Sequence, residues 1–407
     1  MSTELDIDLS PQRFGQGIPV EDFELLRREA PIWWNEREAC WVVSTHPLVE
    51  RINRDPGHFS SQKGSGIGPP DGSTTARRPS ILVEMDPPVH TSYRRLVIRP
   101  FTPRSIGEWE AKVREITRDA VAEFVAEGGG DFVTGVAARV PFRVIATMLG
   151  VPYEDERALF DLSNKMISNS DPDYRSAPED GPRAIVALDD YASGLLDEHR
   201  DLRAKGCPAE DLTDHLLGCE MSGAPLDQAD LENFVRTFIT GGSETTRHLI
   251  SNGLVALLEH PDELARFAAG EVETAPMMEE MLRYVTPVMH HSRATTEDIT
   301  IEGPHGSTDI KEGDRVALWM WSANHDENVF PDPMRFVADR SPNPHTALGG
   351  GGPHYCLGAA LAKLETAAIF EELRPVLGRM AIDGQVDRVW SSFVNGIKRL
   401  PVAVDPS

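Results

Sequence analysis

The sequence predicts a mainly α-helical fold with small β-sheets, and we expect residues 1–407 to form a single domain. Three observations lead to this prediction. Apolar residues recur at steps of three and four in several segments, as they do on the buried face of a helix. Short apolar runs beside turn residues are typical of strands. No internal repeat, low-complexity tract or long linker divides the chain.

The helices are predicted from this periodicity and from the residues that end them. The longest covers about 227–259, with an apolar stripe that includes Leu231 and Leu257, and a His-Pro pair closes it. The proline pair at 87–88 can open another helix. Further helical patterns cover 105–127, 140–149, the region before His199, 276–284 and the segment from Leu357 to Gly378.

Short strands are expected near both ends of the chain. Residues 32–34 and 40–43 flank a polar turn and are predicted to pair. Further strands are expected at 298–301 and 314–319, and 391–402 is predicted to form a closing hairpin. Residues 60–80 are rich in Gly, Ser and Pro without a sustained period, which predicts a long loop. Long loops inside compact domains are commonly lids or binding segments.

Composition excludes several classes of function. The formal charge of -25 argues against binding a nucleic acid or an anionic membrane surface, because both attract basic proteins. A small neutral substrate suits this charge better. The first ten residues carry three acidic side chains and no apolar core, so we expect no signal peptide, and no apolar run is long enough to be a membrane anchor. Four scattered cysteines indicate a reducing compartment, the cytoplasm.

A glycine-rich stretch around Cys356 is the most informative part of the chain. Glycines 349–352 allow backbone conformations closed to other residues, and Cys356 follows where a helix is expected to begin. The amides of a helix N-terminus favour a thiolate, the form of cysteine that binds metals. Zinc and iron–sulfur sites need several ligands at short spacing, and the chain has no CxxC pair. A single thiolate indicates a metal that brings most of its own ligands, as haem iron does.

A Gly-Gly pair lies in the middle of the longest predicted helix. Each glycine in a helix costs about 1 kcal/mol relative to alanine, and this pair, 241–242, is followed by Glu244 and Thr245. One explanation is room for a flat cofactor, beside an acid and a hydroxyl that relay protons or orient a bound oxygen molecule. The other explanation is a helix kink with a back-bonded threonine.

Two further pairs are ambiguous on spacing alone. His90 and Arg94 lie four residues apart on one helical face, where they can bind an anion or face solvent. Glu280 and Arg283 have the spacing of a common surface ion pair. His290 is followed by a second histidine, but neighbours in an extended strand face opposite ways, which argues against a metal site there.

Taken together, these motifs resemble those of the cytochrome P450 family of haem-thiolate monooxygenases. The match spans Met85 to Pro401 in the family's order. Its motifs are Asp86-Pro87-Pro88-Val89-His90-Thr91-Ser92-Tyr93-Arg94-Arg95, Gly241-Gly242-Ser243-Glu244-Thr245-Thr246, Glu280-Met281-Leu282-Arg283 and the Cys356 loop. The resemblance implies a triangular-prism fold with the long central helix over haem b, and Cys356 as the ligand of the haem iron.

The resemblance also implies a role for each matched residue. Gly242 would lie against the cofactor, and Glu244 and Thr245 would deliver protons. The haem propionates would be bound by His90, Arg94, Arg293 and His354. The cysteine loop would be supported by Glu280, Arg283 and, as a third partner, Arg335. Part of 66–82 would cover the substrate pocket, whose expected lining is Leu82, Phe238, Val288, Met289, His290 and Phe393.

The chain departs from the family in the cysteine signature F-G-x-G-x-H-x-C-x-G. Gly349 stands at the Phe position under strict spacing, and Leu348 does if one glycine is an insertion. An aromatic ring near the sulfur helps to shield it, so we expect haem retention or reduction potential to differ from the family norm.

The resemblance implies a cytoplasmic monooxygenase, expected to be a monomer, that hydroxylates a small apolar substrate. The sequence is similar to actinobacterial members that oxidise steroids, terpenoids or branched lipids. A ferredoxin with its reductase is the expected electron donor, because no flavin or iron–sulfur domain is fused to the chain. Two alternatives remain open. One is a peroxide-driven or rearranging member, which would not need an acid–alcohol pair, and the other is a haem-based gas sensor or carrier.

Overall fold

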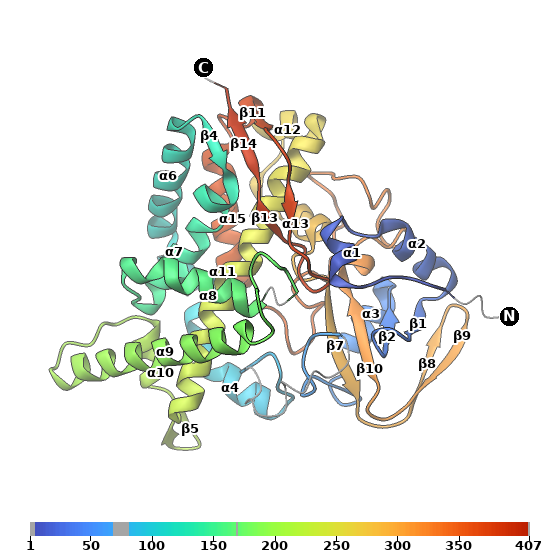
Figure 1. Cartoon of the computed structure of the whole chain (residues 1–407), viewed down its shortest axis with the longest axis horizontal. Coiled ribbons are helices and arrows are strands. Elements are labelled where there is room, and N and C mark those ends of the chain that lie inside the picture. Colours follow the sequence, from blue (N-terminus) through green and yellow to red (C-terminus); the bar gives the residue numbers. More distant parts are fainter. Residues whose placement is uncertain (1–4, 68–80, 168–169, 406–407) are drawn as a thin grey trace.

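The computed structural model describes residues 5–67, 81–167 and 170–405, and most of it is helical (Figure 1). The helices are α1 Pro11–Gly15, α2 Val20–Glu29, α3 His46–Asn53, α4 Val89–Val97, α5 Pro103–Glu108, α6 Glu110–Ala126, α7 Arg139–Leu149, α8 Glu156–Ile167, α9 Asp180–Ala204, α10 Leu212–Leu217, α11 Gln228–Glu259, α12 Pro261–Ala268, α13 Thr274–Val285, α14 Met320–Asn324 and α15 Ala359–Leu373. The predicted mainly α-helical class is confirmed.

The strands are short, as expected, and form five small sheets among the described residues. They are β1 Ile32–Asn35, β2 Cys40–Val43, β3 Phe59–Ser60, β4 Gly129–Asp131, β5 Glu220–Met221, β6 Ala224–Pro225, β7 His290–Thr295, β8 Ile299–Gly303, β9 Gly306–Ile310, β10 Arg315–Trp319, β11 Met380–Ile382, β12 Asp387–Arg388, β13 Ile397–Arg399 and β14 Pro401–Val404. The largest sheet has the order β1-β2-β10-β7-β3 and lies beside the N-terminal segment (Figure 1).

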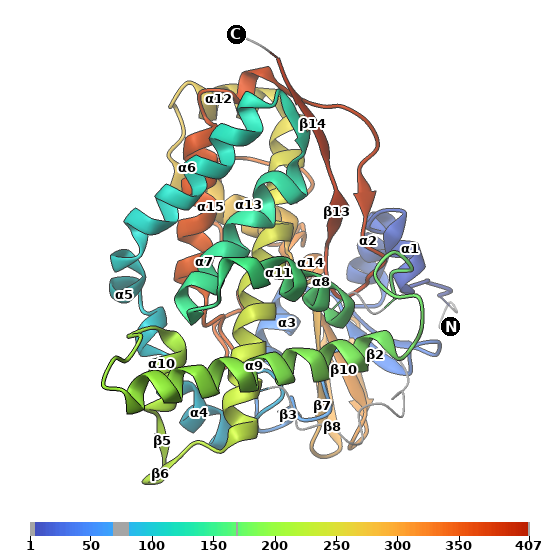
Figure 2. The ribbon, with the colours of Figure 1, turned by 60° about the vertical axis from the view of Figure 1, so that its left-hand side comes forward.

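Helix α11 runs through the centre of the molecule, and α7, α9, α13 and α15 pack against it (Figure 2). The Asp227 side chain caps its N-terminus by accepting a hydrogen bond from the Asp230 amide at 2.8 Å. Its apolar residues, Leu231 and Leu257 among them, are buried. The helix predicted at 227–259 is therefore confirmed, and it places the Gly-Gly-x-Glu-Thr sequence at the middle of the protein.

Three sequence expectations about the elements need correction, and one strand was not expected. The segment 105–127 forms two helices, because the Trp109 amide bonds the Ile106 carbonyl three residues back, at 3.0 Å, and so ends α5 before α6 begins. The last long helix ends at Leu373, before the expected Gly378. Segment 391–402 is not a hairpin, because β13 pairs with β12 and β14 pairs with β11 and β4. Strand β9 was not predicted, since its sequence is mostly polar and exposed.

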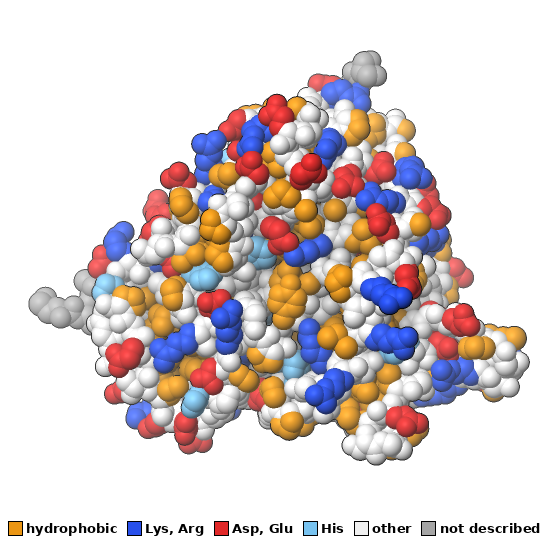
Figure 3. Space-filling view, turned by 180° about the vertical axis from the view of Figure 1, so that it is seen from behind, with side chains coloured by type: hydrophobic (Ala, Val, Ile, Leu, Met, Phe, Trp, Pro, Cys, Tyr) orange, Lys and Arg blue, Asp and Glu red, His pale blue; other side chains and the backbone are white. Residues whose placement is uncertain are grey.

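The core consists of a large helical cluster and smaller clusters around the main sheet. One smaller cluster, the N-terminal cluster, packs Phe23 of α2 against Trp319 and Trp321. The ring centroid of Phe23 lies 4.8 Å from that of Trp319 and 5.6 Å from that of Trp321. Acidic and basic side chains are interspersed over the back of the molecule, with hydrophobic side chains between them (Figure 3). Among the described residues, no helix combines the length and the apolar character that crossing a bilayer requires.

Candidate functional site

The cysteine loop has a backbone shape that depends on its glycines. Gly349, Gly350 and Gly351 have φ values of 100°, 52° and 76°, a region that favours glycine. A Cβ on Gly352 would lie 2.3 Å from the Asn53 carbonyl oxygen. The Cys356 amide donates to the Leu348 carbonyl at 2.8 Å, which closes the loop.

The contacts of this loop bear on which residue stands where the family signature has phenylalanine. Leu348 is half-buried against the helical core and accepts the hydrogen bond from the cysteine amide. Gly349 instead turns away in the left-handed region, towards Asn53. These contacts favour the interpretation with one inserted glycine, in which Leu348 stands at the Phe position.

Cys356 is half-buried three residues before α15 begins. Burial raises the pKa of its thiol, while the Gly358 amide and the charges of Arg94 and Lys363 act in the opposite direction. The helix start favours a thiolate as predicted, but it does not outweigh burial. A bound metal cation would supply the missing stabilisation, because a coordinating thiol loses its proton.

Predicted propionate ligands gather around this loop. The His90 and His354 rings lie 4.4 Å apart, and Arg94 donates to the Tyr355 carbonyl at 2.6 Å. Neither His90 nitrogen has a partner among the described residues, although both are buried. Burial and the nearby charges of Arg293 and His90 lower the pKa of His354 to about 3, and burial lowers the pKa of Arg293 to about 10. Because buried polar groups are normally paired, this cluster fits an anionic group such as a haem carboxylate.

The Gly-Gly pair leaves open space on α11, but at a different glycine than expected. A Cβ on Gly241 would meet nothing within 4 Å, and Gly241 is exposed in an otherwise buried part of the helix. A Cβ on Gly242 would lie 3.0 Å from Ile145 of α7. Gly242 thus allows α7 to approach, and the open space that a cofactor at this helix would need is found beside Gly241. Thr245, whose hydroxyl donates to the Gly241 carbonyl at 3.2 Å, borders the same opening and is half-buried.

Glu244 is fully buried and held by an ion pair that the sequence analysis missed. Arg247 donates to its Oε2 and, through Nη1, to the side-chain Oδ1 of Asn164 in α8 at 2.8 Å. The other carboxylate oxygen, Oε1, has no partner among the described residues. Burial raises the pKa of Glu244 despite the adjacent guanidinium. The spacing of Glu244 and Arg247, three residues apart on a helix, was the available signal.

Glu280 and Arg283 form a fully buried bidentate ion pair, with distances of 2.7 and 2.8 Å. The third partner is Arg340, whose Nε donates to the two Glu280 oxygens at 3.0 and 3.1 Å. The expected third partner, Arg335, contributes its backbone carbonyl, while its exposed side chain pairs with Asp262 at 2.7 Å. The prediction for the Arg335 side chain was therefore wrong.

This ion pair is connected to the start of the cysteine loop by hydrogen bonds. Arg283 donates to the Asn324 carbonyl at 2.8 Å. The Asn324 side chain accepts from the Thr346 amide at 2.7 Å and from its hydroxyl at 2.9 Å. Thr346 in turn accepts the Gly349 amide at 2.8 Å. Asn324 and Thr346 carried no recognisable signal in the sequence.

The residues expected at a substrate pocket are placed in three groups. Val288 pairs with Val394, next to Phe393, whose ring lies 5.5 Å from that of His290. Leu82 and Phe238 belong to the helical core. Met289 is buried in the N-terminal cluster. Most of the covering segment expected at 66–82 lies outside the described residues, so the pocket remains a prediction.

His290 makes a testable contribution to pH-dependent stability. It is buried between Trp319 and Phe393, and burial lowers its pKa to about 3. Below the ordinary histidine pKa the unfolded chain binds a proton that the folded protein does not, so stability falls as pH decreases. Between pH values of about 7.5 and 5 this residue should cost about 2 kcal/mol of unfolding free energy. In urea titrations, His290→Phe should lose that much less stability than wild type over this interval, and an equal loss in both proteins would contradict the assignment.

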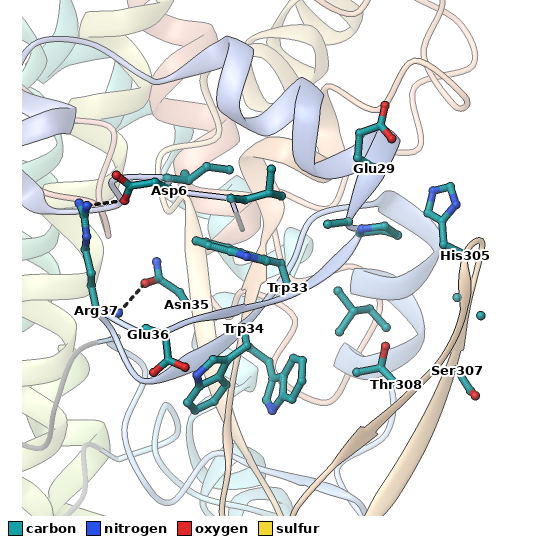
Figure 4. Close-up of a pocket in the computed structure, with 18 residues that line it drawn as sticks. Asp6, Glu29, Trp33, Trp34, Asn35, Glu36, Arg37, His305, Ser307 and Thr308 are labelled. Carbon is teal, nitrogen blue, oxygen red and sulfur yellow. Dashed lines mark hydrogen bonds and ion pairs between the residues drawn. The ribbon is translucent and has the colours of Figure 1, made fainter. Parts of the chain in front are cut away.

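A separate groove of about 1030 Å³ lies on the N-terminal side of the protein (Figure 4). Trp33 and Trp34 of β1 line it, together with His305 from the β8–β9 turn and the ion pair of Asp6 with Arg37. None of the predicted site residues lines this groove. The candidate site is therefore the region of Cys356 and the middle of α11.

Comparison with known proteins shows similarity along nearly the whole chain. The Cytochrome P450 family model matches residues 12–275 and 272–373. A steroid C26-monooxygenase of Rhodococcus jostii is 35% identical over 406 residues, covering 96% of this chain and 83% of that protein. A methyl-branched lipid omega-hydroxylase of Mycobacterium tuberculosis is 33% identical over 393 residues, covering 93% and 90%. The structure of a Mycobacterium marinum cytochrome P450 in complex with pseudoionone aligns with a TM-score of 0.89 at 31% identity, covering 99% of this chain and 100% of that one.

Proposed function

The chain belongs to the cytochrome P450 family and is a monooxygenase of that family, and we propose that it hydroxylates a small apolar substrate of the steroid, terpenoid or branched-lipid class. The relatives named for a steroid and a methyl-branched lipid support this class. The expected pocket residues are also apolar or aromatic apart from His290. The observation that carries the proposal is the glycine-dependent loop that presents one half-buried thiol, Cys356, close to His90, whose two buried ring nitrogens have no partner among the described residues.

We propose haem b as the cofactor, held by this chain's own residues. Cys356 would ligate the iron, and the propionates would be bound by His90, Arg94, Arg293 and His354. When bound, haem supplies the iron at which molecular oxygen is activated, with the thiolate donating electron density. The unpartnered nitrogens of His90 and the buried charge of Arg293 support the propionate assignment.

Two residues of α11 would move protons. The Thr245 hydroxyl borders the opening beside Gly241, and it would donate a hydrogen bond to a bound group there by turning its one proton away from the Gly241 carbonyl. Glu244 keeps its proton to a higher pH than usual, because burial raises its pKa, and its Oε1 is not engaged within the described structure. Through a water molecule it can pass a proton to Thr245. Arg247 fixes the carboxyl in place during this transfer.

We propose a ferredoxin, with its reductase, as the electron donor. Helix α4 borders the cysteine loop through the bond from Arg94 to Tyr355, and Arg95 and Arg99 nearby are exposed. Exposed arginines on and just after the helix that borders this loop suit an acidic carrier, although the chain as a whole is acidic. We further propose that the protein is a single-domain monomer in the cytoplasm. None of the four cysteines forms a disulfide, which supports the cytoplasmic location.

Reconstitution with haem tests the proposed function. The haem-loaded protein should give the reduced carbon-monoxide spectrum of thiolate ligation, and steroids, terpenoids and branched lipids should change its absorption on titration. With ferredoxin, reductase and oxygen, a hydroxylated product should form. Oxygen binding without product would instead support a sensor or carrier, and product formed only with peroxide would support a peroxide-driven enzyme.

The Thr245→Ala variant should retain haem, but a smaller share of the electrons that it consumes should yield product. Without the hydroxyl beside Gly241, proton delivery loses its last donor, and general acid catalysis commonly contributes roughly 100-fold or more. We expect the amount of product formed per electron consumed to fall by at least roughly tenfold, which is less than the full contribution of general acid catalysis. Peroxide formation should rise correspondingly. Parallel assays of reductant, product and peroxide measure this ratio.

Two variants control for the loss of a threonine in α11. Thr245→Ser keeps a hydroxyl and should restore most of the coupling. Thr246→Ala makes the same change at the neighbouring buried position and should leave the ratio close to wild type. Equal coupling in Thr245→Ala and wild type would remove Thr245 from proton delivery.

A further inference from the structure

Asn53, the last residue of α3, contacts two parts of the candidate site with one side chain. Its Nδ2 donates to the Gly349 carbonyl of the cysteine loop at 2.5 Å. Its Oδ1 accepts from Arg293 of β7 at 3.3 Å. The residue is buried, so water cannot easily replace either bond.

The cysteine loop is shaped around this end of α3. The Gly350 carbonyl accepts a hydrogen bond from Arg54 at 3.1 Å, and the absent side chain of Gly352 makes room for the Asn53 carbonyl. At the other end of α3, the His46 ring bonds the Pro344 carbonyl at 2.8 Å. Helix α3 therefore lies along the chain from Pro344 to Gly352 and supports it at both ends.

We propose that Asn53 is a positioning residue, which fixes the cysteine loop and Arg293 relative to each other so that thiolate and propionate ligands bind haem together. This inference rests on the proposed function and adds a residue that no family motif contains. Only an amide has a donor and an acceptor of this geometry in one short side chain. The four glycines are the matching feature of the loop, because they let its carbonyls reach Asn53 and Arg54.

Two substitutions separate the two bonds. Asn53→Asp keeps the size and an acceptor for Arg293, but places a carboxylate oxygen opposite the Gly349 carbonyl. Asn53→Leu removes both bonds. Asn35→Asp is the matched control, because Asn35 is equally buried and its Oδ1 only accepts, from the Arg37 and Glu38 amides at 3.0 and 3.2 Å.

The readout is the spectrum of the reduced carbon-monoxide complex of the haem-loaded protein, followed with time at constant temperature. Asn53→Asp should lose the thiolate-type band roughly tenfold faster than wild type, the factor for a hydrogen bond of about 1.4 kcal/mol, while total haem stays bound. Asn53→Leu should also release haem to apomyoglobin roughly tenfold faster. Asn35→Asp should change neither rate.

The outcomes distinguish this inference from the proposed function. If wild type shows the thiolate-type band and both Asn53 variants keep it as long as the control does, the positioning role is wrong and the monooxygenase assignment stands. If haem-loaded wild type never shows that band, the proposed function fails and this inference with it. Should the leucine variant not fold, the aspartate variant alone still decides, because it preserves the volume of the side chain.

Discussion

The Cys356→Ala variant is expected to lose hydroxylation and the thiolate-type spectrum of the reduced carbon-monoxide complex. Removing an indirect partner of a metal site commonly costs roughly 10–100-fold in metal affinity or activity, and removing the ligand itself should exceed that range. Spectra, haem content and product formation measured on the same preparation test the prediction.

The other cysteines define the control. Burial raises the pKa of the Cys40 thiol to about 12, and Cys219 is also buried with a raised pKa, so neither can readily become a ligand. Cys207 is exposed, and Cys207→Ala should retain the spectrum and the activity of wild type. A thiolate-type band that persists in Cys356→Ala would show that the iron has a different ligand.

The position of the long helix α11 in the sequence was predictable, but the neighbour that each of its residues faces was predictable only in part. Apolar periodicity and a His-Pro end defined α11 to within a residue, because both signals are local. A helix turns about 100° per residue, so an error of one position changes which neighbour a missing side chain faces. This is why the open space lies beside Gly241, whereas a Cβ on Gly242 would meet Ile145.

Contacts between distant segments were not predictable from spacing. Asn53 reaches Gly349, 296 positions later in the chain, and no periodic pattern connects them. Likewise the irregular segment after α14 contains both Arg335 and Arg340, and only its folded path shows that Arg340 reaches Glu280. Sequence patterns identify the residue types of such a site, whereas packing decides which of two similar residues belongs to it.

Glu280→Ala is expected to prevent stable folding. Its carboxylate is fully buried and accepts hydrogen bonds from Arg283, from Arg340 and from the Val337 amide at 2.9 Å. Removing it leaves two guanidinium groups in the interior without their counter-ion, which costs about 3–5 kcal/mol. Proteins of this kind are stable by only about 5–15 kcal/mol, so soluble yield, haem uptake and the unfolding midpoint should all fall sharply.

Two arginine variants give a sharper comparison, because the sequence and the structure disagree about them. Arg340→Ala removes a guanidinium bonded to both Glu280 oxygens and should cost several kcal/mol. Arg335→Ala removes an exposed ion pair with Asp262 and should cost less than about 1 kcal/mol. Denaturant unfolding of the two proteins measures this difference. A larger loss of stability in Arg335→Ala than in Arg340→Ala would instead support Arg335 as the third partner. The arginine that pairs with the buried Glu280 carboxylate should be the one whose removal costs more.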